Sequence, residues 1–223
     1  MLYRVKWYDD WLDDWAPSSN VDYSSDGEFA VITNISCVEE YIEKTGLDLT
    51  SNSLIWVKGK RIGVSEDLTH IYVYSGSSWL ELTLTKVTGN VYKAVPTTDI
   101  YGIRLPVGGG EKVEYDFVVV TYPTSLSPHL TELERSRSRI LIVKPRVMSD
   151  YMRDFGSMSD VLRLSGLISD DERVLFRDFM ENQEVLFLVT KQSAFVGLIV
   201  SMELEHLTTL WRVTLEWKRG RVI

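Results

Sequence analysis

The stretch VLRLSGLISDDERVLFRDFMEN (residues 161–182) predicts a strand followed by a helix in the last third of the chain. Its first eight residues form an apolar run that predicts a strand, and Ser169 or Asp170 then caps a helix that continues to the end of the stretch. Two acidic residues follow in the first turn, where negative charge complements the helix dipole. The spacing predicts one inward stripe on this helix, made of Leu175, Phe176, Phe179 and Met180.

Three further strands are expected after the helix, over Val185–Val189, Phe195–Leu204 and Leu210–Trp217, with a tight turn at His206–Thr209 before the last. The last strand alternates strictly, as a half-buried strand does. One face carries Trp211, Val213, Leu215 and Trp217, and the other carries Arg212, Thr214, Glu216 and Lys218. The residues from about Arg146 to Arg221 are therefore predicted to form one compact unit that packs and assembles.

The middle of the chain has the composition of a β domain. Apolar runs of strand length alternate with turn signals, and 58–60 (Lys-Gly-Lys) has the composition of a hairpin turn. One exception is 37–44, which the pattern favours as a short helix ending before Gly46. The predicted strands are Leu2–Trp7, Phe29–Ile32, Leu54–Val57, Arg61–Val64, Ile71–Tyr74, Trp79–Val87, Val91–Val95, Tyr101–Val107 and Val113–Tyr122.

These elements divide the chain into four parts. Residues 1–28 form an acidic, Trp-rich arm whose second half (17–27) is expected to be a loop, and residues 29–122 form a β-rich domain or insertion. Residues 123–138, rich in Pro, Ser and Thr, are expected to be a linker. Residues 139–223 form the unit described first, opening with a strand over 140–147. The expected fold class is mainly β (α+β), with one flanking helix in the last unit and an additional β domain.

Composition excludes several function classes. A net charge of −8 argues against sequence-specific nucleic-acid binding, because phosphate neutralisation supplies most of that affinity. Cys37 is the single cysteine, so neither a disulfide framework nor a cysteine-based zinc site is expected. The opening residues lack the apolar core of a signal peptide and no apolar run is long enough to span a membrane, so we expect synthesis in the cytoplasm and no membrane insertion.

Catalytic motifs are not expected either. Four aspartates, Asp9, Asp10, Asp13 and Asp14, offer oxygen ligands for a cation such as calcium, but a calcium loop alternates its ligands around a central glycine. A solvated acidic face is the favoured interpretation, and the cation site stays open. The histidines are scattered, and Glu81 or Asp116 would be the carboxylates of a β cleft only if paired. The sequence therefore predicts neither an enzyme nor a cofactor.

Tryptophans and arginines supply the candidate binding residues. Trp7, Trp11 and Trp15 would form one stripe on a helix, and docking onto a neighbouring subunit explains them as well as burial in their own domain. Arg135 and Arg137 alternate with serines, so they fit either a contact with a partner or the charged edge of a strand. Core is favoured for Trp56 and Trp79, with a sugar-binding platform as the alternative.

The last unit resembles the distal tail proteins, tail terminators and related tube-like proteins of long-tailed bacteriophages. The resemblance lies in the order of residues 161–168, the acidic start of the helix at 171–182, the strand at 184–190, the glycine-containing strand at 195–200 and the final strand at 210–218. It covers the C-terminal third only. It implies a tail-tube-like β-sandwich or barrel, and a virion protein that forms a ring, commonly sixfold, around the DNA path with other tail proteins as partners. The tail of the virion is the location that follows.

An alternative from a different class is a carbohydrate-binding β module that attaches to a host surface through Trp56, Trp79 or nearby tyrosines. The two functions are compatible in one chain.

Overall fold

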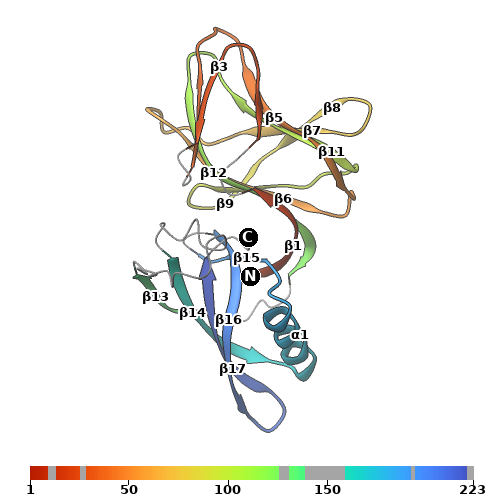
Figure 1. The fold of residues 1–223 in the computed structure, drawn as a ribbon, viewed down its shortest axis with the longest axis vertical. Coiled ribbons are helices and arrows are strands. Elements are labelled where there is room, and N and C mark those ends of the chain that lie inside the picture. The colour runs from red at the N-terminus through yellow and green to blue at the C-terminus, as the bar shows by residue number, and fades with distance from the viewer. Residues whose placement is uncertain (10–13, 26–28, 126–130, 139–158, 192–193, 220–223) are drawn as a thin grey trace, which may run out of the picture. The chain divides into compact units, whose positions relative to one another are not determined.

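The structure is a computed structural model that describes residues 1–9, 14–25, 29–125, 131–138, 159–191 and 194–219, with the backbone alone for 131–138, 159–161 and 219. The chain divides into two compact units (Figure 1). The C-terminal unit comprises Met1–Arg4, Ser125–Thr190 and Phe195–Ile223, and the N-terminal unit comprises Val5–Thr124 and Lys191–Ala194. Both units are mainly β, and the described residues form one helix, so the predicted fold class is confirmed.

The C-terminal unit is an antiparallel sheet with that helix packed on it. Its strand order is β13-β14-β17-β16-β15-β1. The elements are β13 (Thr131–Ser138), β14 (Ser159–Ile168), α1 (Asp170–Glu181), β15 (Leu186–Val189), β16 (Ala194–His206) and β17 (Trp211–Arg219), with the start of β1 (Leu2–Asp9). The predicted sequence of strand, helix and three strands is therefore confirmed.

Helix α1 begins where the sequence predicts. Ser169 is its N-cap: the Ser169 hydroxyl accepts a hydrogen bond from the backbone N–H of Glu172, and the Glu172 carboxylate accepts one from the backbone N–H of Ser169. This capping box satisfies two N–H groups that a helix start would otherwise leave unpaired. Phe176 and Phe179 are buried, while Leu175 and Met180 pack at the margin, so the predicted inward stripe is confirmed.

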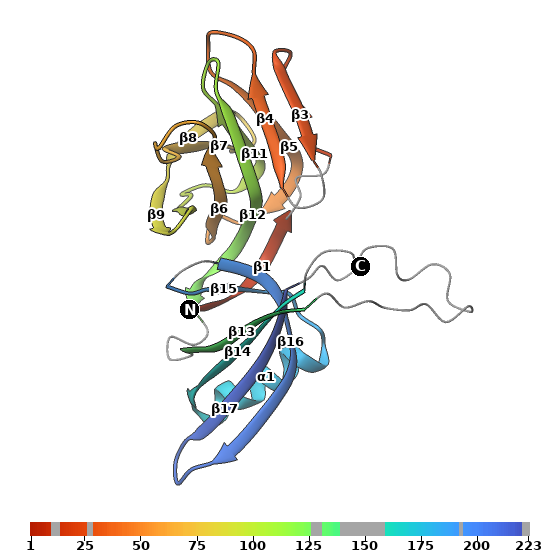
Figure 2. The ribbon, with the colours of Figure 1, turned by 90° about the vertical axis from the view of Figure 1, so that its left-hand side faces the viewer.

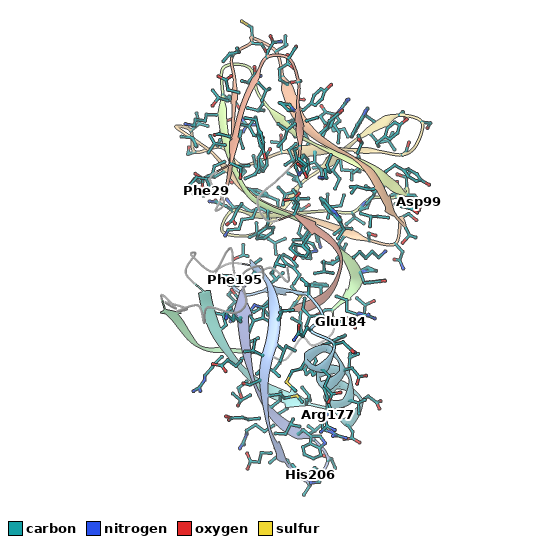
Figure 3. All side chains as sticks on the ribbon, viewed as in Figure 1. Phe29, Asp99, Arg177, Glu184, Phe195 and His206 are labelled. Carbon is teal, nitrogen blue, oxygen red and sulfur yellow. The ribbon has the colours of Figure 1, made fainter. Side chains whose placement is uncertain are left out.

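The core of the C-terminal unit lies between α1 and one face of its sheet (Figure 2). Val213, Leu215 and Trp217 of β17 are fully buried there, as the alternation predicts. Gly197 of β16 leaves room for the Trp217 indole, because a Cβ at Gly197 would lie 2.6 Å from the Trp217 Nε1 atom. β16 and β17 form a long hairpin with His206 near its tip (Figure 3).

The N-terminal unit is built from two antiparallel sheets around one core. In the first sheet β3 pairs with β4 and β4 with β12, and the order continues β12-β6-β10-β9. The strands are β3 (Val21–Ser25), β4 (Ala30–Asn34), β6 (Leu54–Arg61), β9 (Thr85–Thr88), β10 (Val91–Ala94) and β12 (Lys112–Ser125).

The second sheet has the order β2-β5-β11-β7-β8, and Figure 1 labels β5, β11, β7 and β8 of this sheet. Its strands are β2 (Ala16–Pro17), β5 (Glu40–Leu49), β7 (His70–Tyr74), β8 (Trp79–Thr83) and β11 (Ile100–Val107). The predicted strand 79–87 is split at the buried Leu84, because β8 pairs with β7 in the second sheet whereas β9 pairs with β10 in the first. One continuous stretch of chain thus connects the two sheets.

The predicted hairpin turn at 58–60 is wrong, because Gly59 lies inside the single strand β6. Gly59 is opposite Tyr115 of β12, and a Cβ there would lie 2.7 Å from the Tyr115 ring. Glycine is required because the ring crosses the strand. The Tyr115 hydroxyl donates to the backbone oxygen of Pro106 at 2.9 Å, and burial raises the pKa of this phenol.

Three other predicted segments differ. The helix expected at 37–44 is wrong: Glu40 onward forms β5, whose Ile42 side chain is fully buried and whose Gly46 has a φ of +77°. The loop expected at 17–27 contains β3, which pairs with β4. The linker expected at 123–138 contains β13, which pairs with β14. The strand expected at 140–147 lies outside the described residues.

Candidate functional site

The outer face of the second sheet carries the most distinctive cluster of polar and aromatic side chains. Alternation places Ile42, Ile103 and Val73 in the core, so their neighbours along β5, β11 and β7 face outward. The pairing register places one row of outward residues side by side across four strands: Glu43, Arg104, Tyr72 and Glu81. This row crosses the sheet through its central strand, β11.

Arg104 is held between two aromatic rings. Its guanidinium carbon lies 3.9 Å from the centre of the Tyr41 ring and 3.8 Å from the centre of the Trp79 ring. Its Nε–H donates to the Glu43 carboxylate at 2.8 Å. The two rings and the carboxylate fix the orientation of the guanidinium, and each cation–π contact contributes about 0.5 to 2 kcal/mol. We call Tyr41, Glu43, Tyr74, Trp79 and Arg104 the arginine cluster.

Trp79 reaches this position because Gly102 has no side chain. Trp79 is on β8, while Gly102 is on β11, two strands away. A Cβ at Gly102 would lie 3.1 Å from the far edge of the Trp79 indole and 2.9 Å from the backbone oxygen of Lys44. Tyr74, opposite Trp79 on β7, adds a tilted ring contact at 5.3 Å. The four strands therefore assemble the cluster only when the sheet is complete.

The arginine cluster has both hydrogen-bond donors and acceptors. An arginine has five N–H groups. In the part of the chain that the structure describes, only one N–H group of Arg104, the Nε–H, has a hydrogen-bond acceptor. The Arg104 side chain is 21% exposed and the Glu43 side chain 27%, so both reach solvent. Glu81, also on this face, is exposed. The face can thus donate to and accept from the same ligand.

A second polar group lies along the same sheet. The Tyr72 hydroxyl donates to the Glu39 carboxylate at 2.8 Å, and the other Glu39 oxygen lies 3.1 Å from His70 Nε2. Burial, then the hydrogen bond to Glu39 and the negative charges of Glu39 and Glu81, raise the pKa of Tyr72 to about 12. The phenol stays protonated, so Tyr72 is a donor at neutral pH.

The two tryptophans considered as a sugar platform have different positions. Trp56 is 1% exposed, and its indole N–H donates to the buried Thr121 hydroxyl at 3.0 Å. A platform at Trp56 is therefore wrong, because a stacked sugar needs an exposed ring, and the core alternative is confirmed. Trp79 is half-buried on the outer face and belongs to the arginine cluster.

The predicted stripe of Trp7, Trp11 and Trp15 is not a helix face. Trp7 lies on strand β1, half-buried against the core of the N-terminal unit. Trp15 is 3% exposed in that same core, so for Trp15 the alternative of burial in its own domain is confirmed and docking onto another subunit is not. Trp11 lies outside the described residues. The indole of Trp15 is satisfied within its own unit, by the Asp9 carboxylate at 3.1 Å.

That contact also corrects the interpretation of the four aspartates. Asp9 is 6% exposed and accepts from Trp15, so it is not part of a solvated face. Asp14 is exposed, and Asp10 and Asp13 lie outside the described residues. Among the residues that the structure describes, no group of three or more His, Cys, Asp or Glu side chains is arranged to hold a metal ion.

The remaining predicted residues lie apart. Arg135 and Arg137 are on β13, opposite Leu162 and Asp160 of β14, and their predicted role in an interface stays a prediction. Glu81 and Asp116 belong to different sheets, β8 and β12, and Asp116 pairs with Lys58. These two carboxylates therefore do not form the paired arrangement that a glycosidase needs.

Sequence reasoning missed Arg104 and Tyr41. One signal was available for Arg104: a charged residue between Ile103 and Leu105 must face away from the core of a half-buried strand. Its aromatic neighbours are distant in the sequence: Trp79 lies 25 positions and Tyr41 lies 63 positions before Arg104. Only the pairing of the strands could therefore identify them.

Comparisons with known proteins find no matching family model, no matching curated protein and no matching solved structure. In the described part of the chain, the single helix α1 is too short and too polar to cross a bilayer.

Proposed function

We propose that this chain is a structural subunit of a phage tail or baseplate and assembles as a ring around the DNA path. The observation that carries the proposal is the element order of the C-terminal unit: strand β14, the capped helix α1, then β15, β16 and β17. This is the order on which the resemblance to distal tail and tail terminator proteins rests.

The two faces of the C-terminal sheet support such a role. One face is covered by α1 and is apolar. On the other, Arg212 pairs with Glu205 at 2.5 Å and the Ser201 hydroxyl donates to Glu216 at 3.1 Å. A polar face with both charges suits a water-filled channel, and the net charge of −8 of the whole chain is compatible with a DNA path to which DNA does not adhere.

The edge of this sheet offers a means of assembly. β13 is the last strand in the order, and no described strand pairs with its outer edge. An open edge presents backbone donors and acceptors that a strand of a neighbouring subunit can pair with. A head-to-tail contact of this kind closes into a ring when the rotation between subunits fits.

Negative-stain electron microscopy of the purified chain, alone and with tail-tube proteins, tests the proposal. We expect rings, and we expect the double variant Arg135→Glu/Arg137→Glu to abolish them because both positively charged residues of β13 become acidic. Lys112→Glu, an exposed change in the N-terminal unit, is the matched control and should leave them intact. Particles of single subunits at high concentration, with no binding to tail components, would contradict the proposal.

A further inference from the structure

We propose that the arginine cluster (Tyr41, Glu43, Tyr74, Trp79 and Arg104), together with the neighbouring Glu81, binds a neutral saccharide. This function is additional to ring assembly: it resides in the N-terminal unit, so either proposal can fail without the other.

The donor of the site is Arg104. Its guanidinium is held by the Tyr41 and Trp79 rings and by Glu43, and no described side chain accepts from its four terminal N–H groups. A donor that is already oriented loses little conformational entropy when a ligand binds. Terminal guanidinium N–H groups form strong hydrogen bonds with the oxygen atoms of a ligand.

The acceptors flank this donor. Glu43 uses one carboxylate oxygen for Arg104, and Glu81 lies on the same row beyond Tyr72. Each sugar hydroxyl both donates and accepts one or more hydrogen bonds. A chain of adjacent hydroxyls therefore matches a surface on which a guanidinium alternates with carboxylates.

The charge of the site disfavours an acidic ligand. Arg104 is the one cation of the row and Glu43 balances it, while Glu81 adds a second negative charge. A third carboxylate, Glu39, accepts a hydrogen bond from Tyr72 of the same row. An acidic saccharide would bring its charge close to these carboxylates, and a neutral polyol does not meet that repulsion.

The aromatic rings supply the apolar part of the site. Trp79 and Tyr74 are half-buried, so the parts of their rings that face solvent can cover C–H groups of a sugar. Arg104 contacts one side of Trp79, so the ligand meets the exposed margin of the cluster and hydrogen bonding to Arg104 fixes its position. A peptide fits less well, because its backbone offers one donor and one acceptor per residue, whereas each hydroxyl is both.

The test is an array of neutral and acidic hexose oligosaccharides, followed by calorimetric titration of the full chain with maltohexaose, cellohexaose and any other neutral compound bound on the array. We expect binding to a neutral oligosaccharide that changes little with added salt. Arg104→Ala should weaken it roughly tenfold or more, the loss expected for a charged hydrogen-bond partner. Arg212→Ala, which removes another arginine from an arginine–glutamate pair, is the matched control and should have no effect.

Glu81→Gln distinguishes the ligand classes, and the exposed position of Glu81 makes it safe for folding. It should weaken binding of a neutral saccharide, because the amide accepts more weakly than the carboxylate. Three results would overturn the proposal. The first is that no neutral oligosaccharide binds at millimolar concentration, and the second is that only acidic oligosaccharides bind and Glu81→Gln strengthens their binding. The third is that the ligand is a peptide or a tail protein whose binding Arg104→Ala abolishes.

Discussion

The buried hydrogen bond between Trp56 and Thr121 gives a quantitative test of the N-terminal core. Trp56 is 1% exposed, Thr121 is fully buried, and their Nε1 and Oγ1 atoms lie 3.0 Å apart. Thr121→Val keeps the shape of the side chain and removes the hydroxyl that accepts a hydrogen bond from the buried indole N–H. That loss should lower the free energy of unfolding by about 1 to 3 kcal/mol.

A double-mutant cycle isolates this contact. In a Trp56→Phe background no indole N–H remains, so Thr121→Val should there be close to neutral, and the coupling energy should reach about 1 kcal/mol or more. Denaturant unfolding followed by circular dichroism supplies the four free energies. Thr83→Val, the same change at an exposed position of β8, should stay within about 0.5 kcal/mol of the parent. An equal cost of Thr121→Val in both backgrounds would refute the hydrogen bond between Trp56 and Thr121.

Three further predictions concern both units. Ser169→Ala removes the cap of α1 and should cost about 1 kcal/mol of stability, with faster hydrogen exchange confined to the first turn of the helix if the capping box is correct. Gly197→Ala places a Cβ 2.3 Å from the backbone oxygen of Lys218, so it should lower the free energy of unfolding by about 1 to 3 kcal/mol, and an unchanged melting curve would argue against the close packing of β16 on β17. Spectrophotometric titration should show a phenol that ionises near pH 12 and is missing from Tyr72→Phe. Because the pKa of Tyr72 is raised in the folded state, the contribution of this phenol to stability is complete below about pH 10 and is lost as the pH rises towards 12. Glu39→Gln should lower the pKa of Tyr72.

The elements that the sequence predicts correctly are those whose pattern is local. The capped start of α1 at Ser169 and the alternation of β17 from Trp211 to Trp217 each depend on neighbouring positions, and both are confirmed. Predictions from a local pattern are wrong where pairing with a distant strand determines the conformation. Gly59 has the composition of a turn, but it is a glycine because the Tyr115 ring of β12 lies across it.

The candidate site was predictable only in part. The favoured interpretation of Trp79 as a core residue is wrong, because its ring is half-buried on the outer face against Arg104, and its alternative role as a sugar platform stays a prediction. The partners of Trp79 could not be predicted, because Arg104 and Tyr41 join it through the pairing of β5, β11, β7 and β8. Gly102 likewise gives no sign in the sequence that an indole from another strand occupies the space above it.

The mass of the purified chain in solution is the measurement that decides whether it assembles as a ring. Light scattering coupled to size-exclusion chromatography, repeated over a range of concentrations, measures it without labels. Ring assembly predicts a single species whose mass is an integral multiple of the mass of one chain, as a closed ring requires. A mass equal to one chain at every concentration, with or without tail-tube proteins, would contradict it.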